Sequence, residues 1–290
     1  MRLTKRIAFV IAGVFCTALF LAMTMTASAI SISSEAAYKA ATDTDPHLPL
    51  TPNQQTVLAQ KKQAVANVLS GTASAATTGD SSNATGSTAT SSSAMGVAAT
   101  AGTSDSLSAD QNPQKTSYWC GPASVNEALG QMGKWFTQAQ LAQELGTTTA
   151  GTAWSGGPTR TGFPVPDVMN DHQSRNYYIP NPVSYSPSSA EVSNFKANLV
   201  YNISTVGAPL IGDAYEVAGG AYHLVGHPDN RTIFHWFDIR GYTNSGAYTM
   251  YEDSVHGADD VIGWAGGVPA YSTLSSTAIV AIVGGRGYVW

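Results

Sequence analysis

The stretch SYWCGPAS places a cysteine, Cys120, directly before Gly-Pro and an amphipathic run. Val125, Ala128 and Leu129 then recur with helical spacing, which predicts that Cys120 lies at the start of a helix. A helix N-terminus stabilises negative charge, so it lowers the pKa of a thiol and favours the nucleophilic thiolate. The sequence therefore predicts a catalytic nucleophile, the alternative being that Cys120 is a small core residue.

A catalytic thiol needs a base and a group that orients the base. His235 alternates with Phe237 and Ile239 on one face of a predicted strand, and Asp253 follows the next predicted strand. The turn residues 244–246 separate the two strands, so antiparallel pairing would bring His235 and Asp253 together. The carboxylate would then hold the imidazole tautomer and stabilise its charged form.

The remaining site candidates are an amide and four further histidines. Gln114 lies six residues before Cys120, where its side-chain amide and the Cys120 backbone N–H can hold an oxyanion. His223 and His227 are the rival bases and are interpreted as residues of a loop or of the substrate cleft. His256 is interpreted as a loop residue that lines the cleft, and His172 is the remaining candidate.

Three segments resemble a known family: QKTSYWCGPAS from Gln114, HWFDIRGY from His235 and YEDS from Tyr251. Together they resemble the papain-like cysteine peptidases, in particular the group similar to bacteriocin double-glycine leader peptidases (peptidase C39-like). The resemblance implies Cys120 as nucleophile, His235 as base, Asp253 as orienting acid and Gln114 as oxyanion donor. Ser254 stands where the family has proline. Family members that cut leaders act in the cytoplasm and are fused to a transporter, whereas this chain is expected to be secreted, so leader cleavage is a poor guess here.

The N-terminal residues suggest a secreted protein. Residues 1–29 combine a basic start, an uncharged apolar run and the small-x-small sequence Ala27-Ser28-Ala29, which predicts a cleaved signal peptide. Cleavage removes Cys16 and leaves Cys120 as the single thiol, so neither an intramolecular disulfide nor a multi-cysteine zinc site is expected. We therefore expect no cofactor, no metal, and a secreted, extracellular or cell-wall-associated protein without a stable membrane anchor.

The composition divides the rest of the chain into three zones. Residues 30–71 hold one candidate helix that starts at Thr51-Pro52, and they are expected to form a pro-region or a spacer that catalysis does not need. Residues 72–108 are almost wholly Ser, Thr, Ala and Gly, which predicts a disordered linker. Residues 109–290 contain all six tryptophans and are long enough for one domain with its own core.

Within residues 109–290 the pattern predicts an α+β fold of the papain-like kind. Helices are expected after Cys120, over 137–146 and over 188–202, and strands over 209–217, 233–243, 247–255 and 276–284. The helical part would carry the nucleophile, and an antiparallel sheet would carry His235 and Asp253.

These features predict a secreted cysteine peptidase that acts on a peptide or protein substrate. The formal net charge is −5 and no basic cluster occurs, so nucleic-acid binding has no electrostatic support. Two alternatives stay open: a thiol amidase acting on cell-wall peptide, and a catalytically silent module that only binds peptides. The oligomeric state and the side chains preferred around the scissile bond are not fixed by these patterns.

Overall fold

The computed structural model describes residues 32–70 and 102–290. The predicted signal peptide and residues 72–101 of the predicted linker lie outside the described residues. The helices are α1 (Ile32–Thr42), α2 (Pro52–Leu69), α3 (Cys120–Gln131), α4 (Gln138–Glu144), α5 (Pro164–His172), α6 (Ser189–Val200) and α7 (Ser276–Ile282). The strands are β1 (Asp105–Ser106), β2 (Pro180–Pro182), β3 (Leu210–Glu216), β4 (Ile233–Thr243), β5 (Tyr248–Glu252), β6 (Tyr271–Ser275) and β7 (Gly287–Val289). A π-helical turn (Tyr201–Val206) extends α6, and a 3₁₀ turn (Ala265–Gly267) precedes β6.

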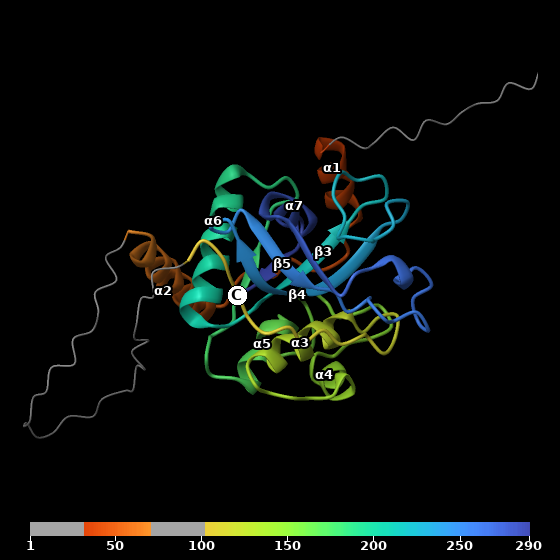
Figure 1. Cartoon of the computed structure of the whole chain (residues 1–290), viewed down its shortest axis with the longest axis horizontal. Helices are drawn as coiled ribbons and strands as arrows, with labels where there is room; N and C mark the ends of the chain where they lie inside the picture. The colour runs from red at the N-terminus through yellow and green to blue at the C-terminus, as the bar shows by residue number, and fades with distance from the viewer. Residues whose placement is uncertain (1–31, 71–101) are drawn as a thin grey trace, which may run out of the picture.

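The strands form one antiparallel sheet in the order β2-β7-β3-β4-β5-β6, and β1 also pairs with β4. Helices α3, α4 and α5 lie together on one side, and α6 and α7 lie on the other (Figure 1). The helical part that begins at Cys120 and the antiparallel sheet that carries His235 agree with the predicted α+β, papain-like arrangement.

Each side of the sheet has its own apolar core. One core joins α3 and α5 to the sheet through residues such as Leu129, Phe163 and Trp236. The other joins α6 and α7 to the opposite face and includes Phe195 and Phe237. Because neighbouring residues of β4 contribute to different cores, the strand is fixed on both faces, and so is the position of His235 within it.

The hairpin of β4 and β5 is the element that brings the predicted base and acid together. Asn244 and Ser245 have positive φ angles of 48° and 52°, as a tight hairpin turn requires. Gly241 has a separate role, because a Cβ there would lie 2.6 Å from the Ser106 Cβ and 2.8 Å from the Asp105 carbonyl oxygen. Glycine at this position therefore allows β1 to approach β4 closely.

The predicted strand over 276–284 is wrong, because these residues form helix α7. The hydroxyl of Ser275 caps this helix by accepting a hydrogen bond from the Ala278 N–H. Its apolar run is buried on several sides, and a short run of this kind has the same pattern in a buried helix and in a buried strand. The strand of this region is β6, which ends at Ser275 where the helix begins.

The segment before the linker differs from the prediction in that it contains two helices, both of which pack on the rest of the protein. Lys39 of α1 is buried and donates to the Ala281 carbonyl oxygen at 3.0 Å. Lys61 of α2 is also buried, donates to Asn176 Oδ1 at 2.8 Å and lies 4.5 Å from the centre of the Trp290 ring. The C-terminal end of the predicted linker also differs from the prediction, since β1 lies within it.

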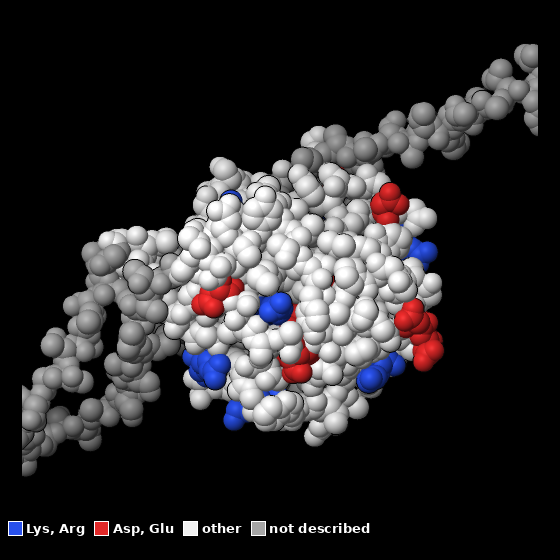
Figure 2. Space-filling view, viewed as in Figure 1, with Lys and Arg blue, Asp and Glu red and all other residues white. Residues whose placement is uncertain are grey.

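The face of the molecule shown in Figure 2 carries few charged residues, and they are scattered rather than gathered into a basic patch. This matches the low proportion of charged residues in the sequence, 11%. Of the helices in residues 32–70 and 102–290, none has both the length and the apolar character to cross a membrane.

Candidate active site

Cys120 is the first residue of α3 and is 8% exposed. The helix starts here because Pro122 fits the first turn, where its missing N–H leaves no bond unmade. Val125, Ala128 and Leu129 anchor the following turns in the core with no exposed surface. The first N–H groups of a helix have no acceptor within it, so they point at the region in front of the thiol.

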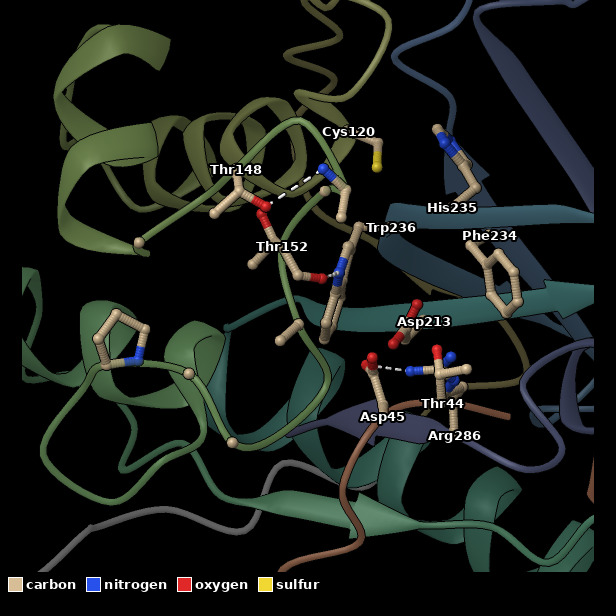
Figure 3. Close-up of a pocket in the computed structure, with 17 residues that line it drawn as sticks. Thr44, Asp45, Cys120, Thr148, Thr152, Asp213, Phe234, His235, Trp236 and Arg286 are labelled. Carbon is tan, nitrogen blue, oxygen red and sulfur yellow. Dashed lines mark hydrogen bonds and ion pairs between the residues drawn. The ribbon is translucent and has the colours of Figure 1, made fainter. Parts of the chain in front are cut away.

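The His235 imidazole lies opposite the Cys120 thiol (Figure 3). Its Nε2 is 3.1 Å from Asp253 Oδ1, which leaves Nδ1 for the thiol. Burial alone would lower the pKa of His235, but the charge of Asp253 and hydrogen bonds to Asp253 and Cys120 outweigh it and raise the pKa well above its usual range. The geometry therefore favours an imidazolium beside the sulfur.

Asp253 follows β5 directly, and its carboxylate contacts two imidazoles. Its Oδ2 accepts from His227 Nε2 at 3.0 Å, and its Oδ1 also accepts the Val255 N–H at 2.9 Å. Burial would raise the pKa of Asp253, yet the charge of His235 and the hydrogen bonds from His227 and His235 hold it far below its usual range. The carboxylate therefore keeps its negative charge at a lower pH than an ordinary aspartate does.

Behind Asp253 the chain of polar contacts continues to Glu216 at the end of β3. His227 Nδ1 lies 3.0 Å from Glu216 Oε2, and His223 Nδ1 lies 3.2 Å from the same oxygen. Although burial disfavours the charged form, hydrogen bonds to Asp253 and Glu216 raise the pKa of His227. The predicted rival base therefore lies on the far side of Asp253 and braces the carboxylate. This contact has no signal in the sequence, because it depends on the path of the loop between β3 and β4.

Gln114 is buried close to the thiol, and its amide is held in one orientation. Its backbone N–H donates to the Ser254 carbonyl oxygen at 2.8 Å, and its Oε1 accepts from the Ser254 hydroxyl at 3.3 Å. Its Nε2 donates to the Thr116 carbonyl oxygen at 2.7 Å and keeps a second N–H. Ser254, the residue that departs from the family pattern, thus orients the predicted oxyanion donor.

Cys120, Phe234 and His235 lie between two cavities that together form a groove. One cavity has a volume of about 400 Å³ and extends past Trp236 toward Asp45 and Arg286. The other has a volume of about 430 Å³ and is lined by Gln114 and by residues 261–264. An extended chain laid along the groove would pass directly over the thiol.

Two of the predicted histidines take no part in this arrangement. His172 lies at the surface, pairs with Glu144 and packs on Phe136. His256 Nδ1 lies 2.8 Å from the Val268 carbonyl oxygen, the contact of a loop residue. The structure thus brings together Cys120, His235, Asp253 and Gln114 and leaves these two apart.

The ligand atoms of His227, His235 and Asp253 lie within 4.8 Å of one another, a spacing that metal sites share. A ligating imidazole must be neutral and must turn a bare nitrogen to the metal. Both nitrogens of His227 instead face carboxylates, and the pKa values of both histidines are raised. The cluster is therefore better suited to hydrogen bonds between charged histidines and carboxylates than to binding a metal ion.

The chain belongs to the peptidase C39-like family, whose model matches residues 106–276. This range contains the thiol, the hairpin with His235 and Asp253, and Gln114. The matched range does not include helices α1 and α2 or strand β7, the last strand along the chain.

Two solved structures are similar to this chain, both at low identity. The peptidase domain of Streptococcus ComA, a bi-functional ABC transporter of a quorum-sensing pathway, is 14% identical, with 63% of this chain and 97% of that chain covered and a TM-score of 0.37. A protein from Bacillus anthracis described as a C39-like peptidase is 9% identical, with 64% and 96% covered and a TM-score of 0.40. No curated protein sequence matches this chain at a significant level.

Proposed function

We propose that this protein is a secreted cysteine peptidase that hydrolyses peptide bonds with Cys120, His235 and Asp253, aided by Gln114. The observation that carries the proposal is the thiol at the start of α3 opposite an imidazole whose Nε2 lies 3.1 Å from a buried carboxylate. This spatial arrangement of nucleophile, base and orienting group is what thiol catalysis requires.

In the acylation step His235 takes the thiol proton, and the Cys120 sulfur attacks the scissile carbonyl carbon. The negative charge that develops on the carbonyl oxygen is held by Gln114 Nε2 and the Cys120 backbone N–H. The imidazolium then protonates the leaving amine, the C–N bond breaks and a thioester remains on the sulfur. Asp253 keeps its negative charge throughout and stabilises the imidazolium.

In the deacylation step His235 removes a proton from water, and the resulting nucleophile attacks the thioester carbonyl. The C–S bond breaks, the carboxylic acid leaves and the sulfur recovers its proton from His235. Water reaches the thioester through the groove, since both of its cavities border Cys120.

The first test is hydrolysis of a fluorogenic peptide library by the wild-type chain and by Cys120→Ala. Because no other thiol remains after loss of the predicted signal peptide, we expect the substitution to lower kcat by on the order of 10⁴-fold or more. His235→Ala is expected to be nearly as severe. His172→Ala removes a histidine outside the groove and serves as the matched control with wild-type rates.

Equal turnover in the wild type and in Cys120→Ala would end the cysteine-peptidase proposal. A separate measurement addresses the silent binding module: the rate at which iodoacetamide alkylates the thiol at pH 6. An activated thiol reacts faster there than free cysteine, whereas a slower reaction would favour a module that only binds peptides.

A further inference from the structure

The cavity of about 400 Å³ beside Cys120 is built from distant parts of the chain. Its walls include the glycine-rich loop of residues 146–158, Trp236 of β4 and Arg286 before β7. Another part is the strap, which we define as residues 43–50 between α1 and α2 and which contributes Thr44 and Asp45 (Figure 3). The strap and Arg286 both lie outside the family match at 106–276. Asp213 and Trp236, which also line the cavity, lie within that match.

Asp213 on β3 lines the cavity and is 3% exposed. In the described part of the chain its side chain has no hydrogen-bond partner and no ion pair within 4 Å. A buried carboxyl without a partner is costly, which is why burial raises the pKa of Asp213 well above its usual range. A ligand that supplied a positive donor would remove that cost.

The charge of Arg286 acts on Asp213 and partly offsets the effect of burial on its pKa, but the ion pairs of the guanidinium are made with the strap. Its Nη2 lies 3.0 Å from Asp43 Oδ1, and its Nη1 pairs with Asp45. Asp45 also accepts the Trp154 N–H at 2.8 Å, which fixes the carboxylate against the wall. Asp43, Asp45 and Asp213 thus surround one guanidinium, and of the three only Asp213 forms no ion pair with it.

We propose that this cavity is a specificity pocket that takes a lysine or arginine side chain of the substrate, next to the scissile bond, with its cationic end paired to Asp213. This rests on the proposed peptidase function and names the substrate class for it. The cavity volume lies within the range of sites that enclose small ligands, so it has room for a long side chain. The half-exposed Phe234 ring at the cavity gives the aliphatic stem an apolar surface.

The test compares kcat/KM for peptides that differ at one position and carry lysine, norleucine, glutamine or glutamate. With each position near the scissile bond varied in turn, we expect one position at which lysine exceeds norleucine by at least on the order of tenfold. Asp213→Asn, nearly the same shape, is expected to abolish that ratio. Asp238→Asn removes a buried carboxyl that lies outside the cavity and is expected to keep it.

A second readout separates this proposal from the peptidase proposal. Binding of the same peptides to Cys120→Ala, measured by calorimetry, reports on the pocket without any turnover. Lysine preference that Asp213→Asn removes would support the pocket even if no peptide were cleaved. Equal affinity for lysine and norleucine, a preference for glutamate, or absence of binding would overturn it.

Discussion

At the scale of single residues, the unusual feature is a carboxylate shared by two imidazoles. Asp253 contacts His235 on the side of the thiol and His227 on the opposite side, and the two rings have centroids 5.2 Å apart. Each positive imidazole stabilises the carboxylate but repels the other imidazole. His227 is therefore placed to moderate the pKa of the base without touching the substrate.

Replacing His227 by glutamine should move the alkaline limb of the pH profile of kcat/KM upward. The amide can keep a hydrogen bond to Asp253 but removes a positive charge about 5 Å from His235. At an effective dielectric constant of about 20, that charge corresponds to on the order of two pH units. The pH profile measured with a neutral peptide checks this.

His223→Gln is the matched control, because His223 contacts Glu216 and not Asp253. Its alkaline limb should coincide with that of the wild type. If both variants shift the limb equally, or neither does, His227 does not act through Asp253.

At the scale of elements, the interface between α3 and the β4–β5 hairpin contains three buried carboxyl groups. Glu127 lies on α3, Asp238 on β4 and Glu252 on β5, so each shares an element, or its end, with a residue of the candidate site. Burial raises the pKa of Glu252 to about 7 and those of Glu127 and Asp238 well above their usual range. The Gln131 side chain joins two of them, since its Nε2 donates to Asp238 Oδ2 at 2.6 Å and to Glu252 Oε1 at 3.3 Å.

The protein should be most stable at mildly acidic pH. Glu252 has a folded-state pKa above its unfolded value near 4.5, so its contribution is complete below pH 4.5 and is lost as pH rises through about 7. We expect Tm to fall by on the order of 5 °C between pH 5 and pH 8. Thermal unfolding across this pH range provides the measurement.

Glu252→Gln should flatten this decline, since the amide does not titrate. Asp260→Asn alters an exposed carboxyl and should keep the wild-type slope. A Tm that rises from pH 5 to pH 8 in the wild type would refute the ionisation argument.

The sequence predicted the hairpin and the start of α3 well because local signals determine them. A short stretch of sequence is enough to show each of these signals: the turn at 244–246, the alternation around His235 and the Gly-Pro after Cys120. The contact of Asp253 with His227 and the ion pairs of Arg286 with the strap could not be predicted, since these residues come together only through the crossing of distant segments. Helix α7 was mistaken for a strand because its apolar run has no polar face.

At the scale of the whole molecule, the N-terminal segment is part of the folded body. The strap lines the groove, while Lys39 of α1 and Lys61 of α2 are buried against other parts of the folded body. Burial lowers the pKa of Lys61 well below its usual range, and that of Lys39 to about 8. That residues 30–71 serve as a pro-region or a spacer stays a prediction, and Asp45 of this segment lies at the groove.

Lys61→Ala in the full chain should lower Tm by several degrees. The change removes a buried donor from Asn176 and from the Tyr177 carbonyl oxygen and takes a cation off the Trp290 ring, a loss on the order of 2–4 kcal/mol. Lys62→Ala, one residue further along and exposed, should change Tm by less than about 1 °C. Equal Tm values for the two variants would mean that α2 adds no stability.

The same contacts have a consequence for what a nick in the chain would do. Between residues 70 and 102 a single cut would divide the protein into two polypeptides. The first would keep Lys39, Lys61 and the acidic strap. The second would keep Arg286, which pairs with the strap, and the oxygen atoms that accept hydrogen bonds from the two lysines. The fragments would form a heterodimer held by these contacts, so a fold that is independent of concentration would become one that dissociates on dilution. Dilution would then also open the wall of the groove that the strap supplies.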